Sequence, residues 1–265
     1  MGNLIINEWL KLTKKLGTWI MLALLLGLTI FLCILGGAIT SRQVGANQTF
    51  ASLASMLSVL NLIVVIVAAT IISEEFSRGT IKFLLIRPYS RTQVYAAKFL
   101  TTLLFGLLST VLMLITCLAA ANLFMKAESP LLPVAGFGDW SALKVALVTA
   151  GVNLLLLSFY IAITMFISAI LRSQAMSVGL GIGLLFGGSL FNDLLFLGQT
   201  KFPWLKWNFF NATNIKETIP QLAGQPLDQW LTLDFWQSLG LLGLYGGLLY
   251  FFGNWIFSAR DVALT

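Results

Sequence analysis

The chain has 265 residues, of which 58% are hydrophobic and only 10% are charged, and its mean hydropathy is +0.91. Soluble domains carry about 25% charged residues, so this composition excludes an ordinary soluble domain and indicates a chain that lies in a lipid bilayer. Histidine is absent and the two cysteines, Cys33 and Cys117, fall within apolar runs, so neither a disulfide framework nor a thiolate metal site is indicated.

Residues 1–16 precede the first long apolar run and have the pattern of an amphipathic helix. Apolar and polar residues fall on opposite helical faces: Ile5, Trp9, Leu12 and Leu16 against Asn7, Lys11 and Lys14. We therefore expect an interfacial helix that lies flat on the inner leaflet. The alternative is a polar lead-in to the first span with no separate role.

Long intervals without charged residues follow. A charged side chain at the centre of a bilayer costs roughly 2.5 to 3.5 kcal/mol, and a helix needs roughly 20 apolar residues to cross about 30 Å of hydrocarbon. The sequence thus predicts an all-α membrane protein whose residues 1–265 form a single transmembrane domain. Its six predicted spans are residues 17–41, 54–73, 99–125, 145–171, 173–192 and 235–259.

Basic residues are distributed unevenly between the two sides of this arrangement. With six spans, both termini share one side with the inner loop at 74–98 and the turn at Arg172. That side holds ten of the 16 basic residues but only four of the ten acidic ones. The positive-inside rule assigns it to the cytoplasm. We therefore expect a multi-pass protein of the cell membrane with both termini in the cytoplasm.

Glycines recur every four residues in the last two predicted spans, where small residues let helix backbones approach closely. These positions are Gly179, Gly183 and Gly187 in the fifth span and Gly243 and Gly247 in the sixth. We interpret them as helix-packing faces. The packing is either within one subunit or between two.

The largest predicted outer segment, residues 193–234, holds an aromatic sequence mixed with lysines. Its aromatic residues are Trp204, Trp207, Phe209 and Phe210. Amphipathic rings settle at the headgroup level of a bilayer, so we expect an interfacial or re-entrant element. The alternative is an aromatic lid at the outer mouth of a transport pathway.

The predicted inner loop, residues 74–98, is the expected contact site for a cytoplasmic partner. Pro88 ends its first helical half, because proline lacks an amide hydrogen and restricts the preceding residue. Ser90 is a candidate N-cap for a second helix, which would run through Lys98 into the third span. The alternative takes the basic residues as topology signals and as anchors for anionic lipid, without a partner.

The loop also carries an ordered motif: Glu75, Gly79-Thr80, Leu84-Leu85, Pro88, Ser90-Arg91 and Lys98. This order resembles the loop between spans two and three of ABC-2 type transporter permeases. The likeness extends along the chain, from the amphipathic N-terminus to the ending FSARDV. The chain is most similar to the compact bacterial permeases of bacitracin-resistance, sodium-export and lantibiotic-immunity systems, which implies a type V exporter-like fold.

The resemblance implies that this loop is a coupling helix, against which a separate cytoplasmic ABC ATPase presses. The implied contact residues are Glu74, Glu75, Phe76, Arg78, Gly79, Thr80, Leu84, Pro88, Ser90 and Arg91, with Arg172 in a second, smaller inner contact. Which of the two glutamates touches the ATPase stays open. The resemblance further implies a dimer with a second permease, a copy or a paralogue, surrounded by membrane lipid.

The expected function is therefore that of an ABC exporter's permease subunit, which moves a peptide antibiotic, drug or lipid outward, as in antimicrobial peptide resistance. No Gly-x-x-x-x-Gly-Lys-Ser/Thr motif occurs, so ATP and Mg²⁺ would bind the partner, and this chain needs no cofactor or metal. We expect neither nucleic acid as a partner nor an enzyme, since no nucleophile–base pair is visible. The alternative is a carrier driven by an ion gradient, although the predicted spans contain no Asp, Glu, Lys or Arg, only polar amides such as Asn61 and Asn153.

Overall fold

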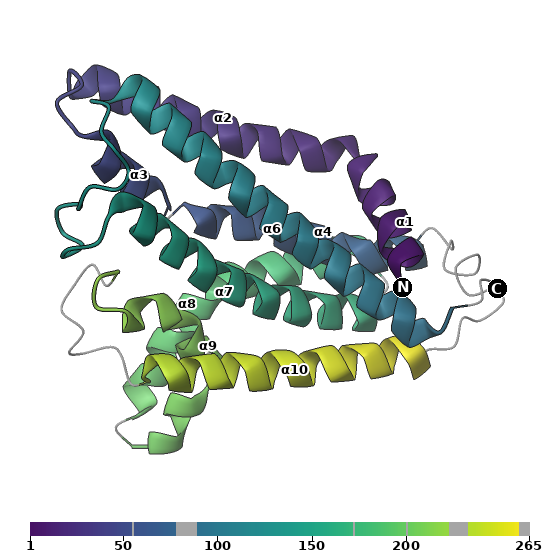
Figure 1. The fold of residues 1–265 in the computed structure, drawn as a ribbon. Helices are drawn as coiled ribbons and strands as arrows, with labels where there is room; N and C mark the ends of the chain where they lie inside the picture. The colour runs from purple at the N-terminus through teal and green to yellow at the C-terminus, as the bar shows by residue number, and fades with distance from the viewer. Residues whose placement is uncertain (55, 78–88, 172, 200, 223–232, 260–265) are drawn as a thin grey trace.

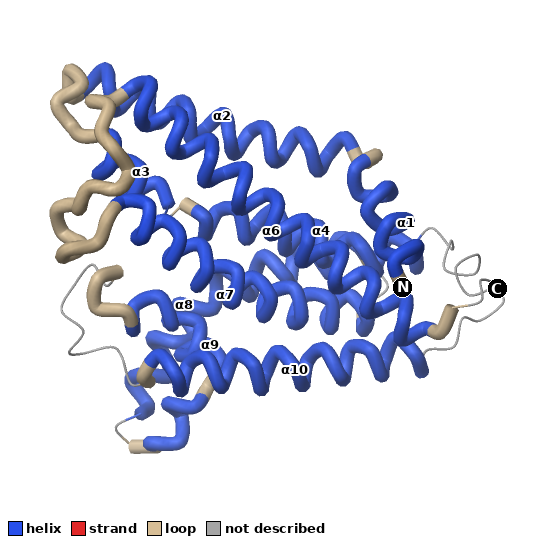
Figure 2. Tube along the Cα trace, in the orientation of Figure 1, coloured by secondary structure: helices blue, strands red, loops and turns tan. Residues whose placement is uncertain are grey.

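The computed structural model describes residues 1–54, 56–77, 89–171, 173–199, 201–222 and 233–259. These residues form helices joined by loops, and no strand occurs among them (Figure 2). The α-helices are α1 (Gly2–Thr13), α2 (Leu16–Ile39), α3 (Ala46–Ala54), α4 (Leu57–Ser77), α6 (Arg91–Phe124), α7 (Ala142–Ile170), α8 (Gln174–Gln199), α9 (Phe209–Ala212) and α10 (Phe235–Ala259). Two 3₁₀-helices, η1 (Pro203–Trp207) and η2 (Thr213–Thr218), flank α9.

Five helices in the described chain are long and apolar enough to cross a membrane: α2, the α3–α4 run, α6, α7 and α10. α8 is bent by 46° between Gln174–Gly188 and Leu190–Gln199, and it makes a sixth when the bent pair counts as one span. The long helices run along one common direction (Figure 1). The prediction of an all-helical chain is therefore confirmed, and the described residues hold five or six helices able to span a membrane where six were predicted.

Several helix boundaries differ from the predicted ones. α4 continues to Ser77 and α6 begins at Arg91, so each helix extends beyond the predicted span limits into the ends of the predicted loop. Ser90 caps α6: its Oγ accepts a hydrogen bond from Gln93 N at 3.2 Å, and Gln93 Oε1 accepts one from Ser90 N at 3.1 Å. This reciprocal capping box confirms the predicted N-cap and explains why the helix begins before the apolar run does.

α1 crosses one end of the bundle, near the first turns of α6 (Figure 1). Its buried side chains are Leu4, Glu8 and Leu12, spaced by four residues, whereas Leu16 is 72% exposed. The predicted apolar face of α1 is therefore wrong in part, because the buried stripe is centred on a glutamate. That glutamate is buried because cationic partners lie beneath the helix.

α4 is the central helix of the bundle and packs against α2, α6, α7 and α8. It is apolar around its whole circumference over the middle turns, which is typical of a helix surrounded by others. The fully buried side chains of α4 are Leu60, Val64, Val65, Ala68, Ala69 and Ile72. In contrast, α2 and α10 expose large apolar side chains, among them Leu24, Phe31, Trp236, Phe251 and Trp255. Lipid is the expected neighbour of such a face.

Polar side chains link α4 to α7 near both ends of α4. Asn61 and Asn153 exchange amide hydrogen bonds of 2.9 and 3.0 Å. Toward the other end, Ser168 Oγ donates to Ala69 O at 2.7 Å and accepts from Ser73 N at 3.1 Å. Breaking such bonds in an apolar interior leaves polar groups without partners, so these contacts fix the register of α4 against α7.

The predicted packing glycines find no partner within one subunit. Nothing in the described chain lies within 4 Å of a Cβ built at Gly179, Gly183, Gly243 or Gly247, and Gly187 meets only Phe191 of its own helix. Close approach occurs instead at Gly253 of α10, where a Cβ would collide with the Tyr95 hydroxyl and lie 3.3 Å from Phe166 Cα. Packing between two subunits stays a prediction.

This difference between the two kinds of glycine gives a first test. We expect Gly253→Ala to destabilise the protein by about 1–3 kcal/mol, because the added methyl group must displace Tyr95 or shift α10 away from α7. The matched control is Gly240→Ala, at an exposed position of the same helix where a Cβ has nothing within 4 Å, and it should not destabilise the protein. Equilibrium unfolding in detergent measures both. Equal effects of the two substitutions would contradict the packing of α10 described above.

Candidate functional site

Charged side chains gather where α1, the end of α4 and the start of α6 meet. We call this group the charge cluster, and its members are Glu8, Lys11, Lys15, Glu74, Glu75 and Lys98. Three members are basic and three are acidic, so the cluster carries no net charge. It lies at the end of the bundle where α10 also ends (Figure 1).

Lys98 of α6 is the centre of the charge cluster and is fully buried. Its ammonium group donates to Glu8 Oε2 at 2.7 Å and to the Ile71 carbonyl at 3.1 Å. Glu75 Oε1 lies 2.9 Å from the same nitrogen. An ammonium group has three donors, and here three acceptors from two other helices surround it. A buried charge is stable only when it is paired and hydrogen-bonded in this way.

Lys11 of α1 joins the same two carboxylates from the exposed side. Its Nζ lies 2.6 Å from Glu8 Oε1 and 2.8 Å from Glu75 Oε1. Each of these carboxylates is therefore shared between two ammonium groups. Beside them, Lys15 at the start of α2 pairs with Glu74. The end of α4 is thus bonded to α1, to α6 and to the residue that precedes α2.

The environment keeps the charged forms of Glu8 and Lys11. Burial raises the pKa of Glu8, but the Lys98 charge and the hydrogen bonds from Lys11 and Lys98 outweigh it, so this pKa lies below its ordinary value. Burial lowers the pKa of Lys11, and the carboxylates of Glu75 and Glu8 raise it above its ordinary value. The stability from Glu8 is therefore lost as pH falls through its lowered pKa, and that from Lys11 as pH rises through its raised pKa. Between those limits Glu8 and Lys11 stay ionised.

An aromatic layer beside the charge cluster ties α4 and α6 to α10. The ring centroid of Tyr95 in α6 lies 5.4 Å from that of Tyr250 and 5.7 Å from that of Phe257. Phe76 of α4 packs edge-on against Phe257, with 6.1 Å between the ring centroids. Arg91 at the start of α6 donates to the Ser258 carbonyl at 2.9 Å. Together with α1, which the charge cluster holds, α4, α6 and α10 are therefore joined at this end of the bundle.

The predicted contact residues of the inner loop divide into two groups. Glu74, Glu75, Phe76, Ser90 and Arg91 are described, and all five lie at this end of the bundle, next to the charge cluster or the aromatic layer. The remaining predicted contacts, Arg78, Gly79, Thr80, Leu84, Pro88 and Arg172, lie outside the described residues. Both glutamates are engaged by lysines of the same chain.

Glu8 and Lys98 are functional candidates to which the sequence assigns no contact. Lys98 closes the motif of the inner loop, just outside the predicted span 99–125, and Glu8 is one charge of the predicted interfacial helix. The available signal was the spacing of Leu4, Glu8 and Leu12, which places all three on one helical face. A carboxylate in the middle of an apolar stripe indicates a buried cationic partner.

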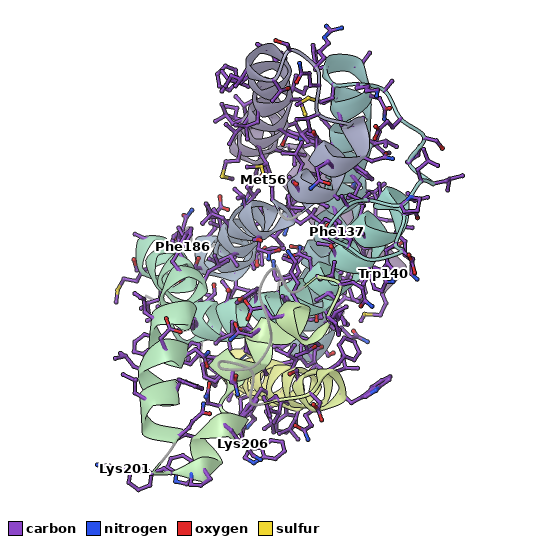
Figure 3. All side chains as sticks on the ribbon, turned by 90° about the vertical axis from the view of Figure 1, so that its left-hand side faces the viewer. Met56, Phe137, Trp140, Phe186, Lys201 and Lys206 are labelled. Carbon is purple, nitrogen blue, oxygen red and sulfur yellow. The ribbon has the colours of Figure 1, made fainter. Side chains whose placement is uncertain are left out.

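The predicted outer aromatic segment divides between surface and core. Trp204 and Trp207 of η1 are exposed, and Lys206 Nζ lies 5.0 Å from the centroid of the Trp207 ring. The two phenylalanines pack inward: Phe209 contacts Phe159 and Tyr245 with centroids at 5.9 and 6.0 Å, and Phe210 stacks on Phe191 at 5.5 Å. Lys201 and Lys206 mark the far edge of this segment in Figure 3. The tryptophans and lysines together therefore form its outward-facing part.

Within the described ranges, no group of three or more Asp, Glu, Cys or His side chains is placed to hold a metal ion. The two cysteines, Cys33 of α2 and Cys117 of α6, are buried and unbonded thiols.

The chain is similar to two proteins of Bacillus subtilis (strain 168). It is 26% identical to "Uncharacterized protein YhcI" over 325 aligned positions, which cover 99% of this chain and 100% of that relative. It is 28% identical to "Uncharacterized membrane protein YdbK" over 226 positions, which cover 82% of this chain and 85% of that one. Together with the apolar helices, the second relative indicates a multi-pass membrane protein.

A family profile matches residues 29–263, from within α2 to beyond the end of α10. The matched part contains Glu74, Glu75 and Lys98 of the charge cluster, whereas α1 with Glu8 precedes it. Because the match covers most of the sequence, the chain belongs to the family described as "Protein of unknown function (DUF2705)".

Proposed function

We propose that this chain is the membrane-spanning permease subunit of an ABC exporter. It moves a hydrophobic or amphipathic substrate outward, such as a peptide antibiotic, a drug or a lipid. A separate cytoplasmic ATPase supplies the energy by pressing on the segment between α4 and α6. The observation that carries this proposal is the charge cluster, because it anchors the bundle on both sides of that segment.

The anchoring explains how a push on the segment would reach the core. Glu75 lies in the last turn of α4, directly before the segment, and Arg91 begins α6, directly after it. Lys98 bonds α6 to both α4 and α1, and Arg91 bonds α6 to α10. A displacement of the segment therefore acts on several helices at once.

α4 carries that displacement further, since it is the most enclosed helix of the bundle. Its polar bonds to α7 through Ala69, Ser73 and Ser168 lie within two turns of Glu75. Apolar helix faces could slide along each other, whereas hydrogen bonds such as these hold α4 and α7 in one register until they break. Such a joint suits an element that moves as a unit between two states.

The proposed arrangement in the cell follows from charge. The end with the charge cluster lies in the cytoplasm, as the positive-inside rule requires of the basic loops, and both termini are cytoplasmic. The relatives support a bacterial cell membrane as the location. A second permease, a copy or a paralogue, completes the pathway. ATP and Mg²⁺ bind the ATPase, and this chain performs no catalysis of its own.

One observation favours a second candidate, a carrier driven by an ion gradient. Such carriers place ionisable groups inside spanning helices, and Lys98 is a fully buried ammonium group within α6. Its position argues against this use, because it lies in the first turns of a 34-residue helix, far from the middle. The carboxylates of Glu8 and Glu75 also neutralise the charge of Lys98. We therefore favour the ABC permease.

The anchoring is tested by removing its central charge. Lys98→Met leaves the carboxylates of Glu8 and Glu75 buried together, so we expect a loss of stability of about 3–5 kcal/mol. The double variant Glu8→Gln/Lys98→Met should lose less than the sum of the two single variants, because the two residues interact directly. Unfolding in detergent at pH 7 measures all three. Lys14→Met, at an exposed position of the same region, is the control and should change stability by less than about 0.5 kcal/mol.

The function is tested by reconstituting the chain in proteoliposomes with a candidate ABC ATPase that copurifies with it. We expect Gly79→Leu and Glu75→Gln to reduce the transport of a peptide antibiotic per ATP hydrolysed by roughly tenfold, since coupling between sites is typically about 1–3 kcal/mol. Lys14→Gln is the matched control and should transport normally. Transport at full rate without any ATPase, driven by a proton or sodium gradient, would establish the carrier instead.

A further inference from the structure

A cavity of about 160 Å³ lies between α4, α7 and α8, at the end of the bundle opposite α1. It is partly open to the surface. Figure 3 looks onto this end, with Met56 beside the start of α4 and Phe186 on α8. The charge cluster is at the other end, so the function proposed above makes no use of this cavity.

One part of the cavity wall is polar, although the wall is formed mainly by helices that are otherwise apolar. The reciprocal amide pair of Asn61 and Asn153 faces it, together with the buried hydroxyl group of Thr149. Tyr160, whose side chain is hydrogen-bonded to Thr213, and Ser58 also line the cavity. Hydroxyl groups can both donate and accept, so this wall can bind an oxyanion and its ester oxygens.

The rest of the wall is apolar, formed by leucine and valine side chains of the same three helices. Binding sites commonly combine an apolar wall with a few converging polar groups. An amphiphile fits such a site, because its polar part meets the hydroxyl groups while its carbon atoms meet the apolar side chains. A fully hydrated ion would leave the apolar wall uncovered.

Lys216 of η2 gives the cavity its charge. It is half-buried at the wall, and burial outweighs the charge of the neighbouring Glu217, so the pKa of its ammonium group lies below its ordinary value. No carboxylate lines the cavity in the part of the chain that the structure describes. The site therefore presents positive charge in surroundings of low polarity, where a nearby anion is attracted far more strongly than in water.

We propose that this cavity binds the phosphate headgroup of an anionic phospholipid. The lysine supplies the counter-charge, and Thr149, Tyr160 and Ser58 supply hydrogen bonds to the phosphate and glycerol oxygens. A cavity of about 150 Å³ holds one benzene molecule, so 160 Å³ holds a headgroup but no acyl chain. The chains lie outside, along the exposed apolar face of α8 that includes Leu180, Phe186 and Leu190.

This site goes beyond the permease proposal and does not depend on it. Lipid binding here needs no ATPase, and it is measured on the purified chain alone. A negative result would therefore leave the proposed coupling at the other end of the bundle untouched. Conversely, failure of the coupling experiment would say nothing against the lipid site.

The test is native mass spectrometry of the full-length chain in detergent, titrated with dioleoyl phosphatidylglycerol and with dioleoyl phosphatidylcholine. We expect one phosphatidylglycerol to bind roughly tenfold more tightly than phosphatidylcholine, as one charge-assisted contact provides. Lys216→Gln should remove this preference, and Lys216→Arg should keep most of it. Lys201→Gln makes the same change of charge at an exposed lysine of the same outer region and should have no effect.

A cavity-filling variant tests the place of binding separately from the charge. Val152→Phe should abolish the preference while Lys216 remains, because the added ring occupies the space that the headgroup needs. If this variant does not fold, the comparison of Lys216→Gln with Lys201→Gln decides. Equal losses in those two variants would overturn the proposal in favour of surface charge. Displacement of the lipid by glycerol 3-phosphate at equal concentration would overturn the assignment to a lipid and identify a free phosphate ester.

Discussion

The burial of one ammonium group constrains the whole inner end of this protein. Lys98 has no access to solvent, and a charge in that position must be neutralised by groups from other helices. Glu75 reaches it from α4 and Glu8 from α1, so both helices are held to α6. Lys11 then bridges the same two carboxylates from outside. The position of α1 across the bundle, and the burial of a glutamate on its inner face, both follow from this requirement.

Polar contacts also fix the position of α4 against α7. Its sides are apolar and would allow sliding against α7, yet amides near one end and serine hydroxyl groups near the other fix one register. The proposed transport cycle depends on this connection, because α4 joins the segment next to the ATPase to the middle of the bundle. The proposed lipid site lies beside the Asn61–Asn153 pair, at the opposite end of α4. One helix thus connects the two regions to which we assign function.

The sequence predicted the number and approximate positions of the helices, because charge-free intervals and apolar length are properties of the sequence alone. It predicted the start of α6 through Ser90, since a capping box is a local interaction. It did not predict which face of α1 is buried, because that choice depends on Lys98, which lies far away in the chain. Nor did it predict which glycines pack: the spacing of Gly243 and Gly247 matches a packing face, but only tertiary structure decides that Gly253 meets Tyr95.

The order of synthesis gives the charge cluster one more consequence. α1 is synthesised before Glu75 and Lys98. At that stage the partner of Glu8 is Lys11, one turn along the same helix. The final partners arrive only after the third apolar segment has entered the bilayer. Until α6 has been made, Lys11 is the only partner of Glu8 within the charge cluster, and the contacts that join α1, α4 and α6 cannot form.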